Sequence, residues 1–126
     1  VELIHPWTGE VDYRYDYIGE AEVERVLAAA AEAAPGWAAR ALDERGALLR
    51  AVAAALRARK EQIAATMSAD MGKLRREALA EIEKSASACE YYADHAIDYL
   101  RDGAIATEAQ RSYVTYEPLG CVFAVM

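Results

Sequence analysis

The sequence has few cysteines and no long apolar run, and both absences narrow what the protein can be. Its two cysteines, Cys89 and Cys121, form neither a CxxC pair nor a Cys/His group at zinc-ligand spacing. No metal site is therefore expected, and a reducing, cytoplasmic location is favoured. No stretch approaches the roughly 18 apolar residues that cross a bilayer, and the first residues do not resemble a signal peptide. We therefore expect no membrane partner.

Basic residues are also scarce. The 14 Lys and Arg residues are outnumbered by 21 Asp and Glu, which gives a formal net charge of −7. No basic run is dense enough to follow a phosphate backbone, so nucleic-acid binding is not expected. The glycine-rich phosphate loops GxGxxG and GxxxxGK are absent as well. His5 and His95 lie far apart in the sequence, and we expect them to be packed or solvated histidines.

What is present is a globular composition. The 126 residues are 55% hydrophobic and 28% charged, which suits at most one ordinary domain with a core of its own. Near the start, residues 1–17 hold two short extended pieces around Thr8-Gly9. In the second piece Val11, Tyr13 and Tyr15 alternate with charged residues, a pattern that predicts a half-buried strand in an antiparallel pair.

Three helices are predicted next, over residues 20–34, 43–70 and 74–100. Apolar residues recur at steps of three and four in each, and in the last helix the stripe includes Ile82, Ser85, Cys89 and Tyr92. Pro35-Gly36, Gly72 and Gly103 are the expected stops, with Asp43 as the N-cap of the second helix. Residues 111–117, rich in aromatic and β-branched side chains, are then expected to form a strand.

The last six residues, 121–126, are all apolar. A continuous apolar run after a Pro-Leu-Gly turn predicts a strand buried on both faces of a parallel sheet. Such a strand needs parallel neighbours and covering helices that the rest of the sequence does not supply. We therefore expect these residues to form the front part of a longer α/β protein.

No catalytic constellation is evident from the residues. Cys89 and Cys121 lie on apolar stretches without a base or helix N-terminus beside them, so both are interpreted as buried structural residues. Glu77, Glu81 and Lys84 recur at steps of four and three, which is typical of a solvated, salt-bridged helix face.

Read together, the motifs resemble the N-terminal part of the aldehyde dehydrogenase superfamily, over essentially the whole chain. The order and spacing of the motifs carry this resemblance, since each of them alone is weak. They are His5-Pro-Trp-Thr-Gly-Glu-Val11, Pro35-Gly-Trp37, Asp70-Met-Gly-Lys73, Glu81-Ile-Glu-Lys84, Tyr91-Tyr-Ala93 and Arg111-Ser-Tyr-Val-Thr-Tyr-Glu-Pro-Leu-Gly120. Within the superfamily the third helix and the final apolar run look most like compact succinate-semialdehyde dehydrogenases.

The resemblance implies an α/β fold of Rossmann type and a three-part division of the chain. Residues 1–105 would be the leading strands and helical part of the cofactor-binding domain, and 106–119 an oligomerisation-type strand. Residues 120–126 would be the truncated first strand of the dinucleotide-binding sheet. The full-length relative would oxidise an aldehyde, with succinate semialdehyde the expected substrate, using NAD or NADP, and would form a homo-oligomeric dimer or tetramer.

The resemblance places only peripheral site residues within the chain. Val125 and Met126 match positions whose backbone borders the cofactor, and Lys84 and Ser85 lie on the helix that reaches the mouth of the substrate tunnel. Lys84 would there attract an acidic semialdehyde. A monovalent cation site of some relatives corresponds to Leu3, Ile4 and Asp70.

The family's nucleophilic cysteine, catalytic glutamate and oxyanion-holding asparagine match no residue of the chain. No catalytic residue is therefore assigned, and the chain alone is expected to be inactive. Two departures from the family pattern, Ala34 in place of its usual phenylalanine and Gly19 in place of its usual Ser/Thr cap, indicate a slightly weaker first helix. The alternative reading is a non-catalytic helical interaction module, whose apolar third-helix stripe and final strand dock onto a partner.

Overall fold

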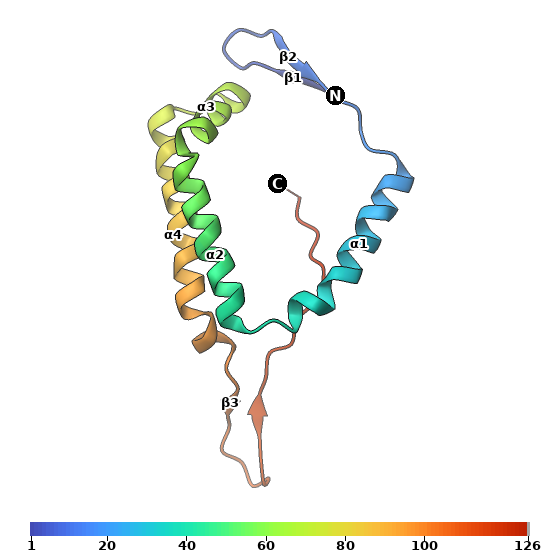
Figure 1. The fold of residues 1–126 in the computed structure, drawn as a ribbon, viewed down its shortest axis with the longest axis vertical. Helices are drawn as coiled ribbons and strands as arrows, with labels where there is room; N and C mark the ends of the chain where they lie inside the picture. The colour runs from blue at the N-terminus through green and yellow to red at the C-terminus, as the bar shows by residue number, and fades with distance from the viewer. Residues whose placement is uncertain (126) are drawn as a thin grey trace.

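The computed structural model describes residues 1–125, and three of its four helices form one layer with a hairpin near each end. In Figure 1 the helices α2 (Leu42–Ala58), α3 (Lys60–Met71) and α4 (Arg75–Leu100) stand together, while α1 (Glu20–Ala38) stands apart. The long antiparallel contact of α2 with α4, extended by α3 against α4, holds the layer together. No helix among these residues is both long enough and apolar enough to span a bilayer.

The first hairpin confirms the predicted antiparallel pair. Strand β1 (Glu2–Ile4) pairs with β2 (Val11–Arg14), with Leu3 opposite Tyr13. Gly9 takes a positive φ of 74° in the connecting turn. The expectation of a half-buried strand was wrong, because every residue of β2 is exposed. The reason is that a two-stranded sheet has no third strand or helix lying across that face.

Helix α1 is longer than its sequence predicts. It begins at Glu20, after the N-cap Gly19, and continues to Ala38 with Pro35 inside it, so Pro35-Gly36 does not end the helix as expected. Pro35 lies in the last turn, where the loss of its N–H removes only one helical hydrogen bond. None of the residues of α1 is buried.

The predicted second helix is in fact two helices. The chain breaks at Arg59, whose φ of −105° and ψ of 9° end α2 and begin α3. The N-cap of α2 is Ala41, so Asp43 lies in the first turn instead of capping it. Gly72 ends α3 in the left-handed conformation with φ 68°, as predicted.

Helix α4 confirms the predicted third helix and carries most of the core. Its buried residues are Ala78, Ile82 and Ala86. The predicted stripe was therefore partly wrong, because Ser85 and Tyr92 are exposed while Ala86, next to Ser85, is buried. Small residues let the helices approach closely: a Cβ added at Gly46 of α2 would lie 3.1 Å from the carbonyl oxygen of Ala93.

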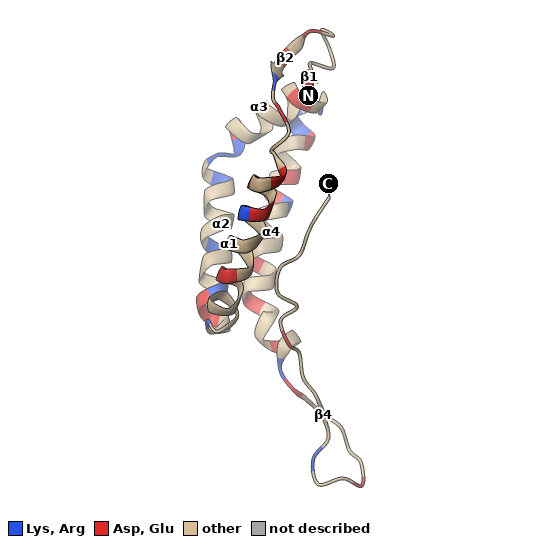
Figure 2. Ribbon diagram, turned by 90° about the vertical axis from the view of Figure 1, so that its right-hand side faces the viewer, with Lys and Arg blue, Asp and Glu red and all other residues tan. Residues whose placement is uncertain are grey.

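Ion pairs connect α2 and α3 to α4 along the rim of this contact. Arg57 of α2 bonds both Glu83, at 2.8 Å, and Glu90. Arg50 bonds Asp94 at 2.6 Å, and Arg75 pairs with Glu61 of α3. Their alternating charges are visible along the helices in Figure 2.

A second hairpin, the arm, projects beyond the helical layer (Figures 1 and 2). It consists of residues 103–114, with β3 (Gly103–Ala104) paired antiparallel to β4 (Tyr113–Val114). The predicted strand over 111–117 is therefore only two residues long here. Near the tip the Thr107 hydroxyl bonds that of Ser112 at 2.7 Å, and Arg111 lies 4.6 Å from the centre of the Tyr113 ring.

The segment after the arm is the largest departure from expectation. Residues 115–125 have no regular secondary structure, and the side chains of Val122 and Phe123 are 79% and 86% exposed. The predicted doubly buried strand is thus not formed among the described residues, because a strand requires a hydrogen-bonded neighbour and none of them lies alongside. Figure 2 shows this segment running along one side of the helical layer.

Candidate functional site

The candidate substrate-side residues, Lys84 and Ser85, lie together on an exposed face of α4. They line a shallow hollow of about 510 Å³, whose other lining residues are Ala80, Glu81 and Ala88. All five recur at helical spacing on one face, which turns away from the buried line of Ala78 and Ile82. Among the described residues Lys84 has no ion-pair partner, so its ammonium group is available to an anion.

Glu81, in the same hollow, is paired with a residue from outside α4. The Lys73 ammonium donates to a Glu81 carboxylate oxygen, and the Lys73 side chain is 28% exposed against 50% for Glu81. The predicted salt-bridged face is therefore present, but Glu81 pairs with Lys73 and not with Lys84. Sequence reasoning missed Lys73, although the Asp70-Met-Gly-Lys73 motif and the stop at Gly72 marked its place.

Of the two candidate cofactor-bordering residues, only Val125 can be described. Its side chain is 83% exposed, and its backbone lies outside any regular strand among the described residues. Met126 lies outside the described residues.

The three candidate cation-site residues belong to two elements that the structure brings together. Leu3 pairs with Tyr13 in the first hairpin, and the carboxylate of Asp70 beside the Tyr13 hydroxyl raises the pKa of that tyrosine. Across the same junction, a Cβ on Gly72 would lie 3.1 Å from Cγ of Pro6. Within residues 1–125 no group of three or more His, Cys, Asp or Glu side chains could hold a metal ion.

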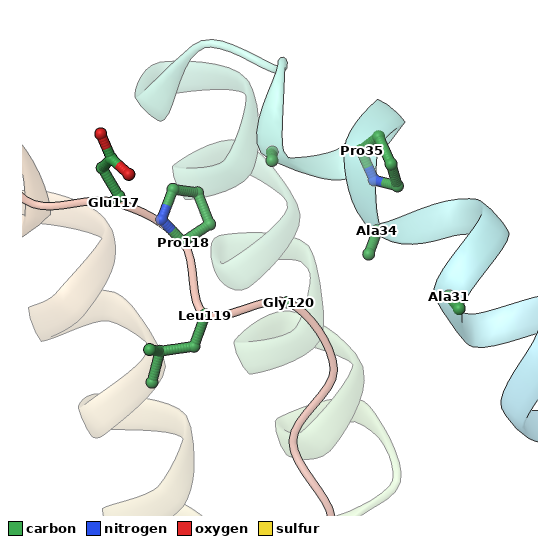
Figure 3. A pocket seen from close by; sticks show the side chains of 8 residues that line it. Ala31, Ala34, Pro35, Glu117, Pro118, Leu119 and Gly120 are labelled. Carbon is green, nitrogen blue, oxygen red and sulfur yellow. The ribbon is translucent and has the colours of Figure 1, made fainter.

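A second hollow, of about 400 Å³, separates α1 from the segment that follows the arm. Figure 3 shows Ala31, Ala34 and Pro35 of α1 on one side and the chain at Leu119 and Gly120 on the other. Apart from Glu117 its lining is apolar or backbone, which provides no acid, base or nucleophile. This hollow is a packing defect between elements and not a chemical site.

The cysteines also provide no catalytic group. Cys89 is half-buried on α4, close to the predicted structural role, whereas Cys121 is exposed, contrary to the prediction that it is buried. The reason is the missing strand: without a sheet around residues 121–125, nothing covers the Cys121 side chain. Neither thiol lies at a helix N-terminus, a position typical of reactive cysteines.

Arg45 is a polar residue that sequence reasoning missed. Its Nε is buried without a hydrogen-bond partner in the described structure, next to a hollow of about 320 Å³. Tyr116 and Glu117 line the same hollow. A buried guanidinium nitrogen without a partner is costly, so Arg45 marks a junction between α2 and the base of the arm.

The comparisons with known proteins cover the whole chain. A family model described as "Aldehyde dehydrogenase family" matches residues 1–126. A Synechocystis protein named "Probable succinate-semialdehyde dehydrogenase [NADP(+)]" is 36% identical over 126 residues, 100% of this chain and 28% of that protein. A succinate semialdehyde dehydrogenase [NAD(P)+] of Escherichia coli is 36% identical over 98% of this chain and 27% of its own length.

A solved structure agrees with these relatives. The succinic semialdehyde dehydrogenase of Streptococcus pyogenes, crystallised with NADP+, is similar with a TM-score of 0.84 and 33% identity. The match covers 90% of this chain and 25% of that one. The chain thus spans about a quarter of the length of the proteins that it resembles.

Proposed function

The chain belongs to the aldehyde dehydrogenase family, and we propose that it forms part of a full-length enzyme. That enzyme oxidises succinate semialdehyde to succinate with NAD or NADP as the cofactor. The observation that carries this proposal is the match of the whole chain to succinate-semialdehyde dehydrogenases of two bacteria at 36% identity. The described architecture, with one helical layer followed by an extended apolar segment, supports the α/β fold that the family implies.

Within this enzyme the chain would divide into the three parts that its sequence predicts. We propose that residues 1–105 form the helical cover of the cofactor-binding domain and 120–126 its first strand. Residues 106–119 then contribute to oligomerisation as a dimer or tetramer. The exposed, two-stranded arm supports the last assignment, since an exposed strand edge is a ready surface for pairing with another chain.

Lys84 and Ser85 are the residues to which we assign substrate recognition. Both line the α4 hollow, and Lys84 has no ion-pair partner in the described part of the chain. An ammonium group at a tunnel mouth attracts the carboxylate end of a semialdehyde, and the Ser85 hydroxyl adds a hydrogen-bond donor. The reaction itself needs a nucleophile that neither Cys89 nor Cys121 provides, so we propose that the chain alone is inactive.

In this proposal two residues of the chain border the cofactor, and no residue of the chain takes part in the chemical step. When bound, the nicotinamide would supply the acceptor for the hydride that leaves the substrate. We assign Val125 and Met126 as backbone positions that border it. The exposed Val125 is compatible with this role.

The test of the proposed function uses the full-length enzyme that carries this chain. Formation of reduced nicotinamide is followed with succinate semialdehyde and with butanal, which has the same carbon chain without the carboxylate, and with NAD and NADP in turn. We expect a higher kcat/KM for succinate semialdehyde, and Lys84→Met should remove most of this preference by raising KM. Equal kcat/KM values for the two aldehydes in the unmodified enzyme would contradict the proposed substrate.

The alternative is a non-catalytic helical interaction module. The observation that favours it is the exposed apolar surface on α1, where Val26 and Leu27 are each about half exposed. A module of this kind would fold alone, so the isolated chain would melt as a monomer in one sharp, cooperative transition. The enzyme proposal expects no such transition.

A further inference from the structure

Positive side chains outnumber negative ones around the α4 hollow. Two lysines, Lys73 and Lys84, flank one carboxylate, that of Glu81. Lys73 lies just after Gly72, whose left-handed backbone ends α3 and lies against Pro6. The backbone that carries Lys73 is therefore fixed on both sides, and its ammonium group is held at Glu81.

Glu81 and Lys84 lie three residues apart on α4, a spacing that places their side chains within reach of each other. A free Glu81 carboxylate would therefore pair with Lys84 and cancel its charge. The ammonium group of Lys73 pairs with the Glu81 carboxylate instead, so the positive charge of Lys84 stays uncompensated at the hollow. That charge is the feature that distinguishes an anionic ligand from a neutral one of the same shape.

We propose that Lys73 is a specificity-determining residue: by engaging Glu81 it keeps Lys84 free to bind the carboxylate of the aldehyde substrate. This inference rests on the proposed function, because it assumes that Lys84 meets the substrate. Lys73 itself does not touch the substrate. It is a positioning residue that acts through Glu81.

The first test replaces Lys73 in the full-length enzyme. Lys73→Met releases Glu81 to pair with Lys84, so KM for succinate semialdehyde should rise about two- to fivefold, the range that exposed charge pairs provide. The kcat for this substrate and the KM for butanal should not change. Lys73→Arg keeps the ion pair and is the matched control, with kinetic constants like those of the unmodified enzyme.

A second variant should lower KM for succinate semialdehyde instead of raising it. Glu81→Gln removes the carboxylate and leaves both lysines positive, so KM for succinate semialdehyde should fall about twofold, within the same range for exposed charges. A merely structural ion pair would predict that losing either partner raises KM for both aldehydes. The double variant Lys73→Met with Glu81→Gln should restore the KM of the unmodified enzyme.

The outcomes separate this inference from the proposed function. If Lys84→Met raises KM for succinate semialdehyde but Lys73→Met does not, Lys73 has no part in specificity and only this inference is overturned. If Lys84→Met leaves the preference over butanal unchanged, the role of Lys84 and this inference are overturned, while the proposed substrate stands. Equal kcat/KM values for the two aldehydes in the unmodified enzyme would overturn the proposed substrate itself. If Lys73→Met prevents folding, a higher KM in Glu81→Gln would overturn the inference, and a lower one would support it.

Discussion

Gly72 combines a left-handed backbone with surroundings that leave little room for a side chain. Its φ is 68°, and a Cβ added to it would lie 3.1 Å from Cγ of Pro6. Both features oppose any larger residue, because the left-handed conformation costs a non-glycine residue roughly 1 kcal/mol and the contact would force Pro6 to move. The end of α3 and the first hairpin depend together on this one glycine.

We therefore expect Gly72→Ala to lower the free energy of unfolding by about 1–2 kcal/mol. The measurement is the melting temperature of the full-length enzyme. Gly36→Ala is the matched control, because Gly36 lies in α1 with no atom within 4 Å of the added Cβ. Alanine should there stabilise the helix by about 0.5–1 kcal/mol. Equal changes in melting temperature for the two variants would contradict the argument that a side chain at position 72 is strained.

Single residues also show where sequence reasoning reaches its limit. The step of three and four predicted α4 but placed Ser85 and Tyr92 on the buried stripe. In the structure the buried residues of the two helices are mostly small: Gly46 and Ala53 of α2, and Ala78 and Ala86 beside Ile82 of α4. In an alanine-rich sequence every helix face looks weakly apolar. Only the neighbouring helix decides which of these faces is buried.

Among the elements, the α2 and α4 pair carries a pH-dependent contribution. Arg57 donates to Glu90, which lowers the pKa of that carboxyl group from its usual value of 4.5. The same pairing, together with Glu83, raises the pKa of Arg57. In the unfolded chain Glu90 regains its usual pKa. The ion pair therefore contributes fully to stability above pH 4.5 and is lost as the pH falls through the lower, folded value.

We expect Arg57→Met to remove this contribution, so that its melting temperature falls less steeply below pH 4.5 than that of the unmodified enzyme. The difference between the two proteins should be largest near neutral pH and small at the lowest pH. Arg76→Met is the control, because the guanidinium of Arg76 lies 4.0 Å from its nearest carboxylate and is 82% exposed. A constant difference at every pH would argue against the role of Glu90.

Helix α1 is poorly packed along the hollow shown in Figure 3. The departure at Ala34, where the family resemblance implies phenylalanine, coincides with that hollow. We expect Ala34→Phe to fill it and raise the free energy of unfolding by about 0.5–2 kcal/mol, the usual gain for a filled cavity. The measurement is the melting temperature, with Ala28→Phe as an exposed control on the same helix. A loss of stability in Ala34→Phe alone would mean that the hollow cannot accept the ring.

The elements also differ in how well they could be predicted. Gly72 ended α3 as expected, since glycine at a helix end has a specific backbone role. Gly103 does not act this way, because α4 ends at Leu100 with Arg101 as its C-cap and Gly103 lies in β3. The break at Arg59 carried no such signal: Leu56 and Ile63 are seven residues apart, which suits one continuous helix as well as two. Pro35 was over-interpreted as a stop, although a proline in the last turn leaves the helix intact.

At the scale of the whole molecule, the described residues bury little. The buried apolar residues are one isoleucine and four alanines, while Phe123 and Leu119 are 86% and 95% exposed. Exposed apolar surface of this kind marks a binding site or an aggregation hazard. The strand prediction for 121–126 was made from composition alone and required neighbours that the described residues do not include.

We therefore expect the isolated chain to bind a hydrophobic dye and to aggregate at micromolar concentration. The reason is that the apolar face of α1 and residues 119–125 have no cover. The measurement is dye fluorescence together with light scattering, and the full-length enzyme at the same molar concentration is the control. An isolated chain that scattered no more light than the enzyme, and bound no more dye, would contradict this reasoning.

The arm adds a consequence for limited proteolysis. Its tip carries Arg111, an exposed trypsin site on a two-stranded hairpin that stands clear of the helices. A subunit with a free arm would be cut there early, whereas a strand paired with another subunit resists cleavage because a protease needs the chain extended in its own active site. Under the proposed oligomerisation through the arm, the rate of tryptic nicking at Arg111 would therefore fall as the enzyme concentration rises, and a rate independent of concentration would contradict that proposal.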